Sequence, residues 1–260
     1  MYELTSHRHY TGRTHEPFTI QLMGTKFYII TAPADVTAAF RDTSALNFDG
    51  HLARLLQNFG VKPEAFQKSW HKPKPGDWCY IPNNPINPGQ LDLIHFVEET
   101  FKKQLLPGKH MDKMSSMFLD SLRTDLHWDR LGCIWCGELC NEPSCKHVSL
   151  YSLCRFFIVE ATTRSLFGSH LHDIEPNIVE YMCEFNDHVW MVVFRYPGVF
   201  GNPSAKPRKR LMAALTKFIQ LPEHKRGEVC WAVKNILAAM EIVEIDMDSR
   251  ASMMLMSFWA

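Results

Sequence analysis

The sequence predicts a mainly helical protein with a small β-hairpin near its N-terminus. From about residue 90 onward, apolar residues recur at spacings of three and four, the period of a helix with one core-facing side. Between residues 18 and 30 they alternate with polar residues, which is the period of a half-buried strand. Apolar residues make up 46% of the chain, including 17 Phe and 7 Trp, and this composition is typical of a globular protein.

The hairpin is predicted from Phe18–Leu22 and Phe27–Ile30, joined by a turn that contains Gly24. Pro33 then opens a short helix, because proline is favoured in the first helical turn. Three residues of this helix are predicted to face inward: Val36, Ala39 and Phe40. Residues 70–90 are predicted to form a loop, since five prolines exclude regular structure there. A long loop in a compact domain is often functional, so this one is a candidate wall of a binding site.

Five apolar stripes predict five helices after this loop. Their members are Ile94, Val97, Phe101 and Leu105; Met111, Met114, Phe118 and Leu122; Leu150, Leu153, Phe157 and Ala161; Ile178, Tyr181, Phe185, Val189 and Val192; and Leu211, Leu215 and Phe218. Gly or Pro follows most of these stripes and supplies a stop signal, for example Gly168 and Pro222.

The last ten residues contain a run of six large apolar side chains: Met253, Met254, Leu255, Met256, Phe258 and Trp259. Leaving all six in water would forfeit about 9–18 kcal/mol. That matches the net stability of a whole domain, roughly 5–15 kcal/mol. The run is therefore expected to be the opening of a buried helix whose continuation and cover are missing.

The order of these segments resembles the N-terminal half of a cytochrome P450 of the fungal type. Glu16–Leu22 with Tyr28–Asp35 is similar to the first strands and helix B of that family, and Val97–Gly108 is similar to the end of helix C. Val148–Gly168 is similar to helix E, and Leu215–Arg226 followed by Cys230–Lys234 is similar to helix G and the next helix. Ser252–Ala260 is similar to the opening of helix I.

The resemblance implies an incomplete cytochrome P450-like fold in which residues 1–260 form one partial domain. The complete family member would be a haem-thiolate monooxygenase that oxidises a small lipophilic metabolite such as a sterol, terpenoid or polyketide. Its implied partner is NADPH-cytochrome P450 reductase, and its implied location is the cytoplasmic side of the endoplasmic reticulum. This chain has no membrane anchor in its sequence, so it is expected in the cytoplasm.

The family's strict motifs are not found in these 260 residues. No cysteine has the Phe-x-x-Gly-x-x-x-Cys-x-Gly setting, and Glu160 and Arg164 are too far apart for Glu-x-x-Arg. The chain alone is therefore expected to hold no haem stably and to be inactive, since the cysteine thiolate supplies electron density to the iron. Lys102 and Lys103 are the candidate contacts for haem propionates, with a solvated lysine face as the alternative. The loop at Trp70–Pro88 and the helix at Phe185–Phe194 are expected to line an apolar substrate pocket.

A cysteine cluster is the main competing signal. Cys133, Cys136, Cys140 and Cys145 lie close enough in sequence to hold zinc, with His147 nearby. A non-catalytic zinc-binding interaction module is thus the alternative function. The alternative to a zinc site is a Cys-rich surface insert with no function of its own. A third hypothesis is a haem-free remnant that binds apolar ligands or a partner. Nucleic acid is not expected, because Lys plus Arg and Asp plus Glu both number 28.

His170 and His172 form a weaker metal candidate together with Asp173. Two histidines after a helix-ending glycine are more often exposed on a loop, which is the expectation for this pair.

Overall fold

The computed structural model describes residues 16–22, 25–42, 46–127, 140–142, 145–147, 149–196 and 201–258. They are mainly helical, with a two-stranded antiparallel sheet at the start, and this confirms the predicted fold class at that level. The chain divides between Arg54 and Leu55 into two compact units. Each unit is described by itself below.

The first unit holds β1 (Phe18–Leu22), β2 (Thr25–Ile29), α2 (Pro33–Arg41) and the start of α3 (Asp49–Asn58). The two strands pair antiparallel with Phe18 opposite Ile29, which agrees with the predicted hairpin. The prediction that Phe40 faces inward was wrong, since its side chain is 82% exposed. No residue of α2 is buried, because nothing described in this unit covers either side of the helix.

Among its described residues, the second unit is helical apart from one short hairpin and the proline-rich loop before α5. Its elements are α4 (Pro63–Ser69), α5 (Leu93–Leu105), α6 (Lys109–Asp125), β3 (Cys140–Glu142), β4 (Cys145–His147), α7 (Leu150–Phe167), α8 (His170–Ile174), α9 (Ile178–Val193), α10 (Ala205–Gln220), a 3-10 turn at Glu223–Lys225, α11 (Trp231–Ile242) and α12 (Met247–Met256). The stops predicted at Pro107–Gly108, Gly168 and Pro222 follow the ends of α5, α7 and α10, whereas Pro197 and Gly198 lie outside the described residues. Gly168 ends α7 with a φ of 72°, and a Cβ there would lie 2.7 Å from the carbonyl oxygen of Glu228.

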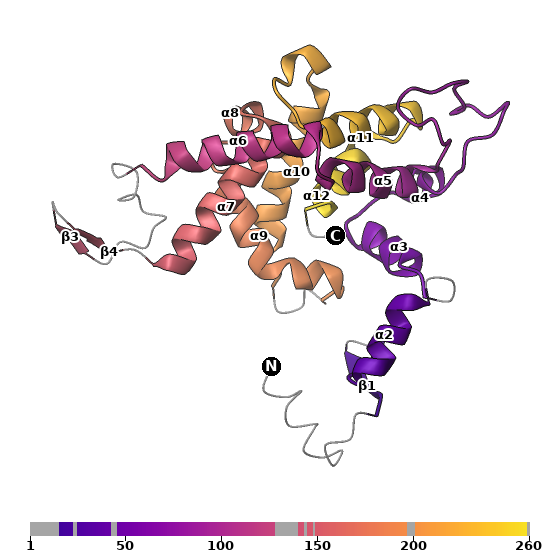
Figure 1. Ribbon diagram of the computed structural model, residues 1–260, viewed down its shortest axis with the longest axis horizontal. Helices are drawn as coiled ribbons and strands as arrows, with labels where there is room; N and C mark the ends of the chain where they lie inside the picture. The colour runs from indigo at the N-terminus through magenta and orange to yellow at the C-terminus, as the bar shows by residue number, and fades with distance from the viewer. Residues whose placement is uncertain are drawn as a thin grey trace. The chain divides into compact units, whose positions relative to one another are not determined.

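The core of this unit runs through a series of neighbouring helices. α6 packs on α7, α7 on α9, α9 on α10, and α10 on both α8 and α12 (Figure 1). The stripe predicted for α10 is fully buried, with Leu211, Leu215 and Phe218 all at 0% exposure. Phe218 also meets Phe167 of α7 edge to face, with 5.5 Å between the ring centroids. α10 is therefore the central helix of the second unit.

The C-terminal apolar run is covered, contrary to expectation. α12 packs against α10, and its residues Met253–Met256 are each no more than 7% exposed. Phe258 stacks on Phe167 with 5.3 Å between the ring centroids. Trp259 lies outside the described residues. The helix also starts earlier than predicted, because Asp246 caps it and accepts a hydrogen bond from the backbone N–H of Ser249.

Three of the predicted core stripes are only partly buried. On α7, Phe157 and Ala161 are buried as predicted, whereas Leu150 is 72% exposed. On α6 the predicted stripe is half-buried, and the residues that reach the interior are Ser121 and Asp125. On α5 the buried face includes Thr100 and Gln104 and leaves Leu105 58% exposed. Polar residues therefore occupy core positions that periodicity assigns to apolar neighbours.

Candidate functional site

A pocket of about 620 Å³ opens in the second unit where the proline-rich loop meets α5 and the first residue of α11. We name it the α5 pocket. Its wall includes Lys72, Pro85 and Asn87 from the loop, His95 and Lys103 from α5, and Trp231 from α11. The loop predicted to be a binding-site wall therefore does line a cavity.

Two buried asparagines give the loop its shape. The Asn84 side-chain oxygen accepts hydrogen bonds from the backbone N–H groups of Ile86 and Asn87, at 3.0 and 3.2 Å. Asn87 in turn bonds both backbone groups of Leu91, donating to its carbonyl at 2.7 Å and accepting from its N–H at 3.0 Å. These side-chain hydrogen bonds take the place of the regular backbone hydrogen bonds that a loop with five prolines cannot form. The wall is thus fixed by its own hydrogen bonds.

The α5 side of the pocket carries charged groups. Asp92 caps the helix by accepting from the N–H of His95, and the His95 ring nitrogen Nδ1 lies 2.8 Å from the same carboxylate. In the last turn of α5, Lys103 lines the pocket. The other candidate, Lys102, is 2.8 Å from Glu98 and 3.3 Å from Glu99. Hydrogen bonds to these two carboxylates raise the pKa of Lys102.

Gln104 links α5 to α11, and Trp231 packs α11 on His110 of α6. Neither was singled out from the sequence as a site residue. The Gln104 side chain is 1% exposed, accepts from the N–H of Ala232 at 3.1 Å and donates to the carbonyl of His110 at 2.9 Å. The Trp231 ring stacks on His110 with 4.3 Å between centroids. A glutamine four residues after Thr100 on a buried helix face is the signal that could have indicated this polar link.

The predicted second wall of the pocket was wrong. Phe185 of α9 is fully buried and packs edge to face on Phe59, with 6.2 Å between centroids. The side chain is therefore core material and does not face the α5 pocket.

The four cysteines whose side chains the structure describes do not fit the role of a haem ligand. Burial raises the pKa of Cys79, and it also raises the pKa of Cys230, whose sulfur accepts a hydrogen bond from the N–H of Val233 as the cap of α11. Burial likewise raises the pKa of the half-buried Cys183, and Cys154 is exposed on α7. None of the four lines the α5 pocket. We therefore derive no chemical step through haem.

The cysteine cluster is only partly within the described residues. Cys133 and Cys136 lie outside them. Cys140 and Cys145 lie on the β3–β4 hairpin, where Cys140 is opposite His147 and Cys145 is opposite Glu142. Among the described residues, no group of three or more His, Cys, Asp or Glu is placed to hold a metal ion.

The expectation that the His170–His172 pair lies exposed on a loop was wrong for His172. His172 does not lie on an exposed loop, but is 7% exposed on α8. Its Nε2 is 3.0 Å from the hydroxyl of Thr163, and its Nδ1 is 3.6 Å from Glu160, a carboxylate that Arg164 contacts at 2.5 Å. Burial, followed by the charge of Arg164, lowers the pKa of His172 from 6.5 to about 4. This histidine is a buried neutral hydrogen-bonding group.

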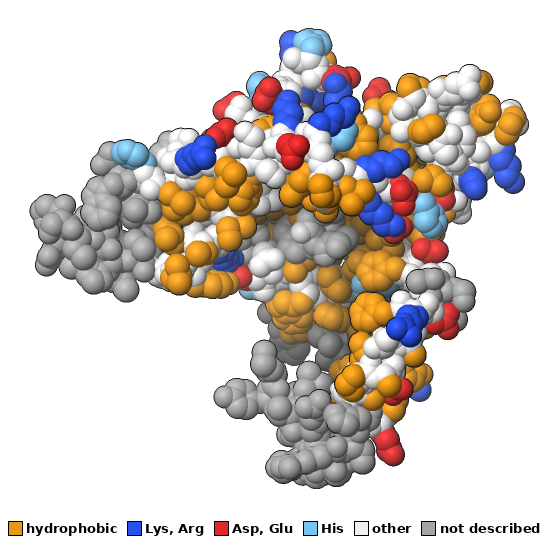
Figure 2. Space-filling view, viewed as in Figure 1, with side chains coloured by type: hydrophobic (Ala, Val, Ile, Leu, Met, Phe, Trp, Pro, Cys, Tyr) orange, Lys and Arg blue, Asp and Glu red, His pale blue; other side chains and the backbone are white. Residues whose placement is uncertain are grey.

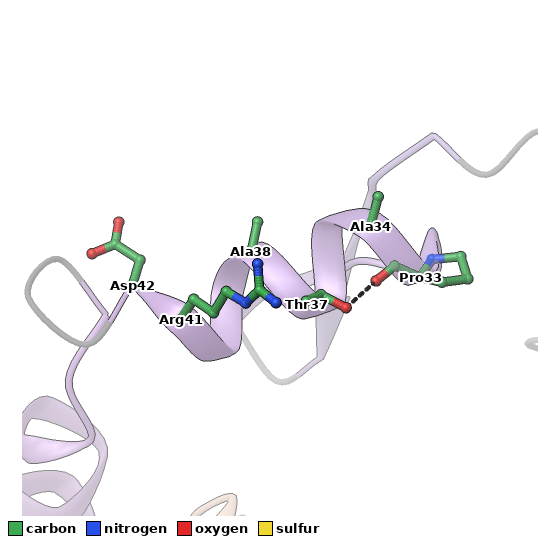
Figure 3. A pocket seen from close by; sticks show the side chains of 6 residues that line it. All are labelled: Pro33, Ala34, Thr37, Ala38, Arg41 and Asp42. Carbon is green, nitrogen blue, oxygen red and sulfur yellow. Dashed lines mark hydrogen bonds between the residues drawn. The ribbon is translucent and has the colours of Figure 1, made fainter.

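A second hollow lies on the first unit (Figure 3). Among the described residues, all of its lining comes from one helix and the residue after it, from Pro33 to Asp42. The Thr37 hydroxyl donates to the carbonyl of Pro33 at 2.8 Å and so turns back on its own helix. Since no second element within the described part of the chain closes this hollow, it is an open side of α2 there.

Comparison of the chain with known protein families gives no matching family, and comparison with curated proteins gives no matching sequence. No helix within the described residues is both long enough and apolar enough to cross a membrane.

Proposed function

We propose that this chain is the N-terminal, substrate-side part of a cytochrome P450-like monooxygenase. One observation carries the proposal: the order of elements along the chain. A hairpin and three short helices are followed by a long loop and then by a run of helices, and the hairpin, the first short helix and the later helical segments resemble counterparts in that family. The complete protein would oxidise a small lipophilic molecule with haem, oxygen and electrons from a reductase, and residues 1–260 would be inactive alone.

One earlier argument for this kinship is lost. The C-terminal apolar run was expected to lack a cover, and α10 covers it instead. The proposal therefore rests on the segment order, to which the loop that lines the α5 pocket belongs. Of the two lysines suggested as propionate contacts, Lys103 is the better candidate, because Lys102 is already held by Glu98 and Glu99.

Sequencing the transcript downstream of the Ala260 codon tests the proposal. We expect an open reading frame with a Glu-x-x-Arg motif and a haem-binding cysteine loop. The extended protein should give a haem-thiolate band in its reduced carbon monoxide difference spectrum, and residues 1–260 should give none. A reading frame that ends without the cysteine loop would refute the kinship, and a haem-thiolate band from residues 1–260 would refute their proposed inactivity.

The register of β3 and β4 favours one second candidate, a zinc-binding module. It sets Cys140 directly across from His147, and directly opposed residues on paired strands lie close together. Zinc content of the purified protein tests this candidate. One tightly bound zinc that is lost in Cys140→Ser, but retained in the control Cys79→Ser, would support it. Protein purified without zinc that also fails to bind added zinc would exclude it.

A further inference from the structure

The α5 pocket contains two lysine side chains that form no ion pair within the described part of the chain. Lys72 comes from the proline-rich loop and Lys103 from the last turn of α5, and both line the same cavity of about 620 Å³. Figure 2 shows charged side chains gathered over α5, next to hydrophobic ones. Cations that line a cavity attract an anionic group of a ligand.

The three carboxylates among the lining residues are already engaged by other groups. Asp92 accepts a hydrogen bond from the backbone N–H of His95 and lies 2.8 Å from the His95 ring. Lys102, which does not line the pocket, lies 2.8 Å from Glu98 and 3.3 Å from Glu99. The charges that remain to act on a ligand are therefore those of the two lysines.

A buried hydroxyl lies close to one of these lysines. Thr100 is 2% exposed and lines the pocket, and its hydroxyl makes no hydrogen bond with any described residue. A spacing of three places Thr100 and Lys103 on the same side of α5. A buried hydroxyl without a partner is costly, and an acceptor atom of a ligand in the pocket can satisfy it. The ammonium and the hydroxyl thus offer donors to one acceptor group.

Much of the remaining wall is apolar. Its apolar residues come from the loop, α5 and α11, and they are Pro85, Ile86, Pro88, Leu91, Phe96 and Trp231. A mostly apolar cavity with a few convergent polar groups is the usual form of a small-molecule site, and the volume of this one suits a drug-sized ligand. The hydrogen bonds of Asn84 and Asn87 fix the loop before any ligand arrives, which lowers the entropic cost of binding.

We propose that the α5 pocket binds a lipophilic carboxylic acid in its ionised form. The carboxylate lies between Lys72 and Lys103 and accepts a hydrogen bond from the Thr100 hydroxyl. The apolar body lies against Trp231 and the prolines of the loop, where burial supplies much of the affinity. Binding depends on the residues of this pocket alone and does not rest on the proposed function, which the reading frame beyond Ala260 tests.

Fluorescence anisotropy of two pyrene probes tests the preference for a carboxylate. Pyrenebutyrate and pyrenebutanol share one aromatic body and differ in the charge at the end of the chain. For pyrenebutyrate we expect a dissociation constant on the order of 10 µM, as for a ligand of about 20 non-hydrogen atoms. The alcohol should bind at least about 10-fold more weakly, because it lacks charge-assisted hydrogen bonds. Equal affinities overturn the proposal, and so does the absence of pyrenebutyrate binding.

Two double variants that change the net charge equally test the location. Lys72→Gln with Lys103→Gln should weaken pyrenebutyrate binding at least about 10-fold and leave pyrenebutanol binding unchanged. The control is Lys74→Gln with Lys109→Gln, at exposed positions that do not line the pocket, and it should keep the preference for the acid. All four positions are exposed, so circular dichroism should show unchanged folding. A preference that survives the first pair, or that the control pair also removes, overturns the proposal.

The hydroxyl is tested by Thr100→Val, which keeps the shape of the buried side chain. Loss of the hydrogen bond should weaken pyrenebutyrate binding about 5-fold. The control is Thr124→Val on α6, because the Thr124 hydroxyl donates to the carbonyl of Asp120 at 2.9 Å and lies outside the pocket. This control should leave the affinity unchanged. An unchanged affinity in Thr100→Val would refute the placement of the carboxylate beside α5.

Discussion

Two apolar helices of the second unit have opposite environments. Met253–Met256 of α12 lie against α10 and are almost fully buried. Leu150 and Ile158 of α7 are more than half exposed, although they belong to a stripe of the same kind. The difference lies in the neighbours. α10 presents Leu211, Leu215 and Phe218 to the interior, whereas no described element covers the side of α7 that carries Leu150 and Ile158.

The comparison shows what apolar periodicity can and cannot predict. It identifies the side of a helix that gains free energy from burial. It does not identify the partner, because the partner depends on how distant segments pack. The sequence therefore predicted an exposed α12 and a buried Leu150, and the structure reverses both.

The largest expected difference between α12 and α7 is in the free energy of unfolding that a leucine-to-alanine substitution removes. Leu255 is 0% exposed, so Leu255→Ala should lower the free energy of unfolding by about 3 kcal/mol through lost burial and a cavity. Leu150→Ala removes the same atoms at a site 72% exposed and should change it by less than about 0.5 kcal/mol. Urea unfolding at protein concentrations low enough to keep the chain monomeric measures both values.

Equal costs for the two truncations would contradict the assigned burial. Leu106→Ala, at 61% exposure, is a second exposed control and should behave like Leu150→Ala. If Leu150→Ala proved as costly as Leu255→Ala in the monomer, the first half of α7 would have a cover that the described residues do not provide.

The buried contact between Thr163 of α7 and His172 of α8 should also make stability depend on pH. The pKa of His172 falls from 6.5 to about 4 on folding, mainly through burial. Between these two pKa values the unfolded chain binds a proton at His172 that the folded chain does not bind. The resulting loss of folding stability is absent above pH 6.5 and grows as the pH falls toward 4. At the lower limit it should reach about 3 kcal/mol. Urea unfolding at several pH values measures this slope.

The variant His172→Gln should flatten the profile in that window, because glutamine can still donate to the Thr163 hydroxyl but does not titrate. The control is His224→Gln, at an exposed position of the 3-10 turn, which should keep the wild-type slope. An unchanged slope in His172→Gln would assign the pH dependence to other groups.

Much of the fold followed from local signals. The hairpin, the loop, the stop at Gly168 and the buried stripe of α10 all depend on residues close together in sequence. Burial of Thr100 and Gln104 could not be predicted in this way. Gln104 is buried because its amide links Ala232 and His110, and Ala232 is 128 residues away in sequence. Polar residues in a core are explained by their partners, which periodicity does not reveal.

The candidate site shows the same difference between what local sequence predicts and what contacts between distant segments decide. The loop was predicted as a pocket wall from its prolines, and it is one. Trp231 completes the pocket from a distant helix, which no local pattern indicates. The same limit explains the error for Phe185, since an aromatic residue on an amphipathic helix fits a pocket wall or a core equally well. Its contact with Phe59 decides for the core.

The smallest expected difference concerns the first residues of the two helices. Asp246 caps α12 through the N–H of Ser249 at 3.3 Å and is 2.8 Å from Lys62. Asp246→Ala should cost about 1–2 kcal/mol, mostly from the cap, because Lys62 is 53% exposed and its ion pair is screened by solvent. Ser149 caps α7 with an equal 3.3 Å bond to the N–H of Ser152.

Ser149→Ala should cost only about 0.5 kcal/mol, since the uncovered first turn of α7 can unravel without opening the core. Burial tends to raise the pKa of Asp246, but hydrogen bonds from Lys62 and Ser249 outweigh it and hold that pKa below 3.8. The contribution of Asp246 is therefore complete above pH 3.8 and is lost as the pH falls through the lowered pKa, so both variants are compared at neutral pH. Similar costs for the two caps would mean that the start of α7 is anchored as firmly as the start of α12.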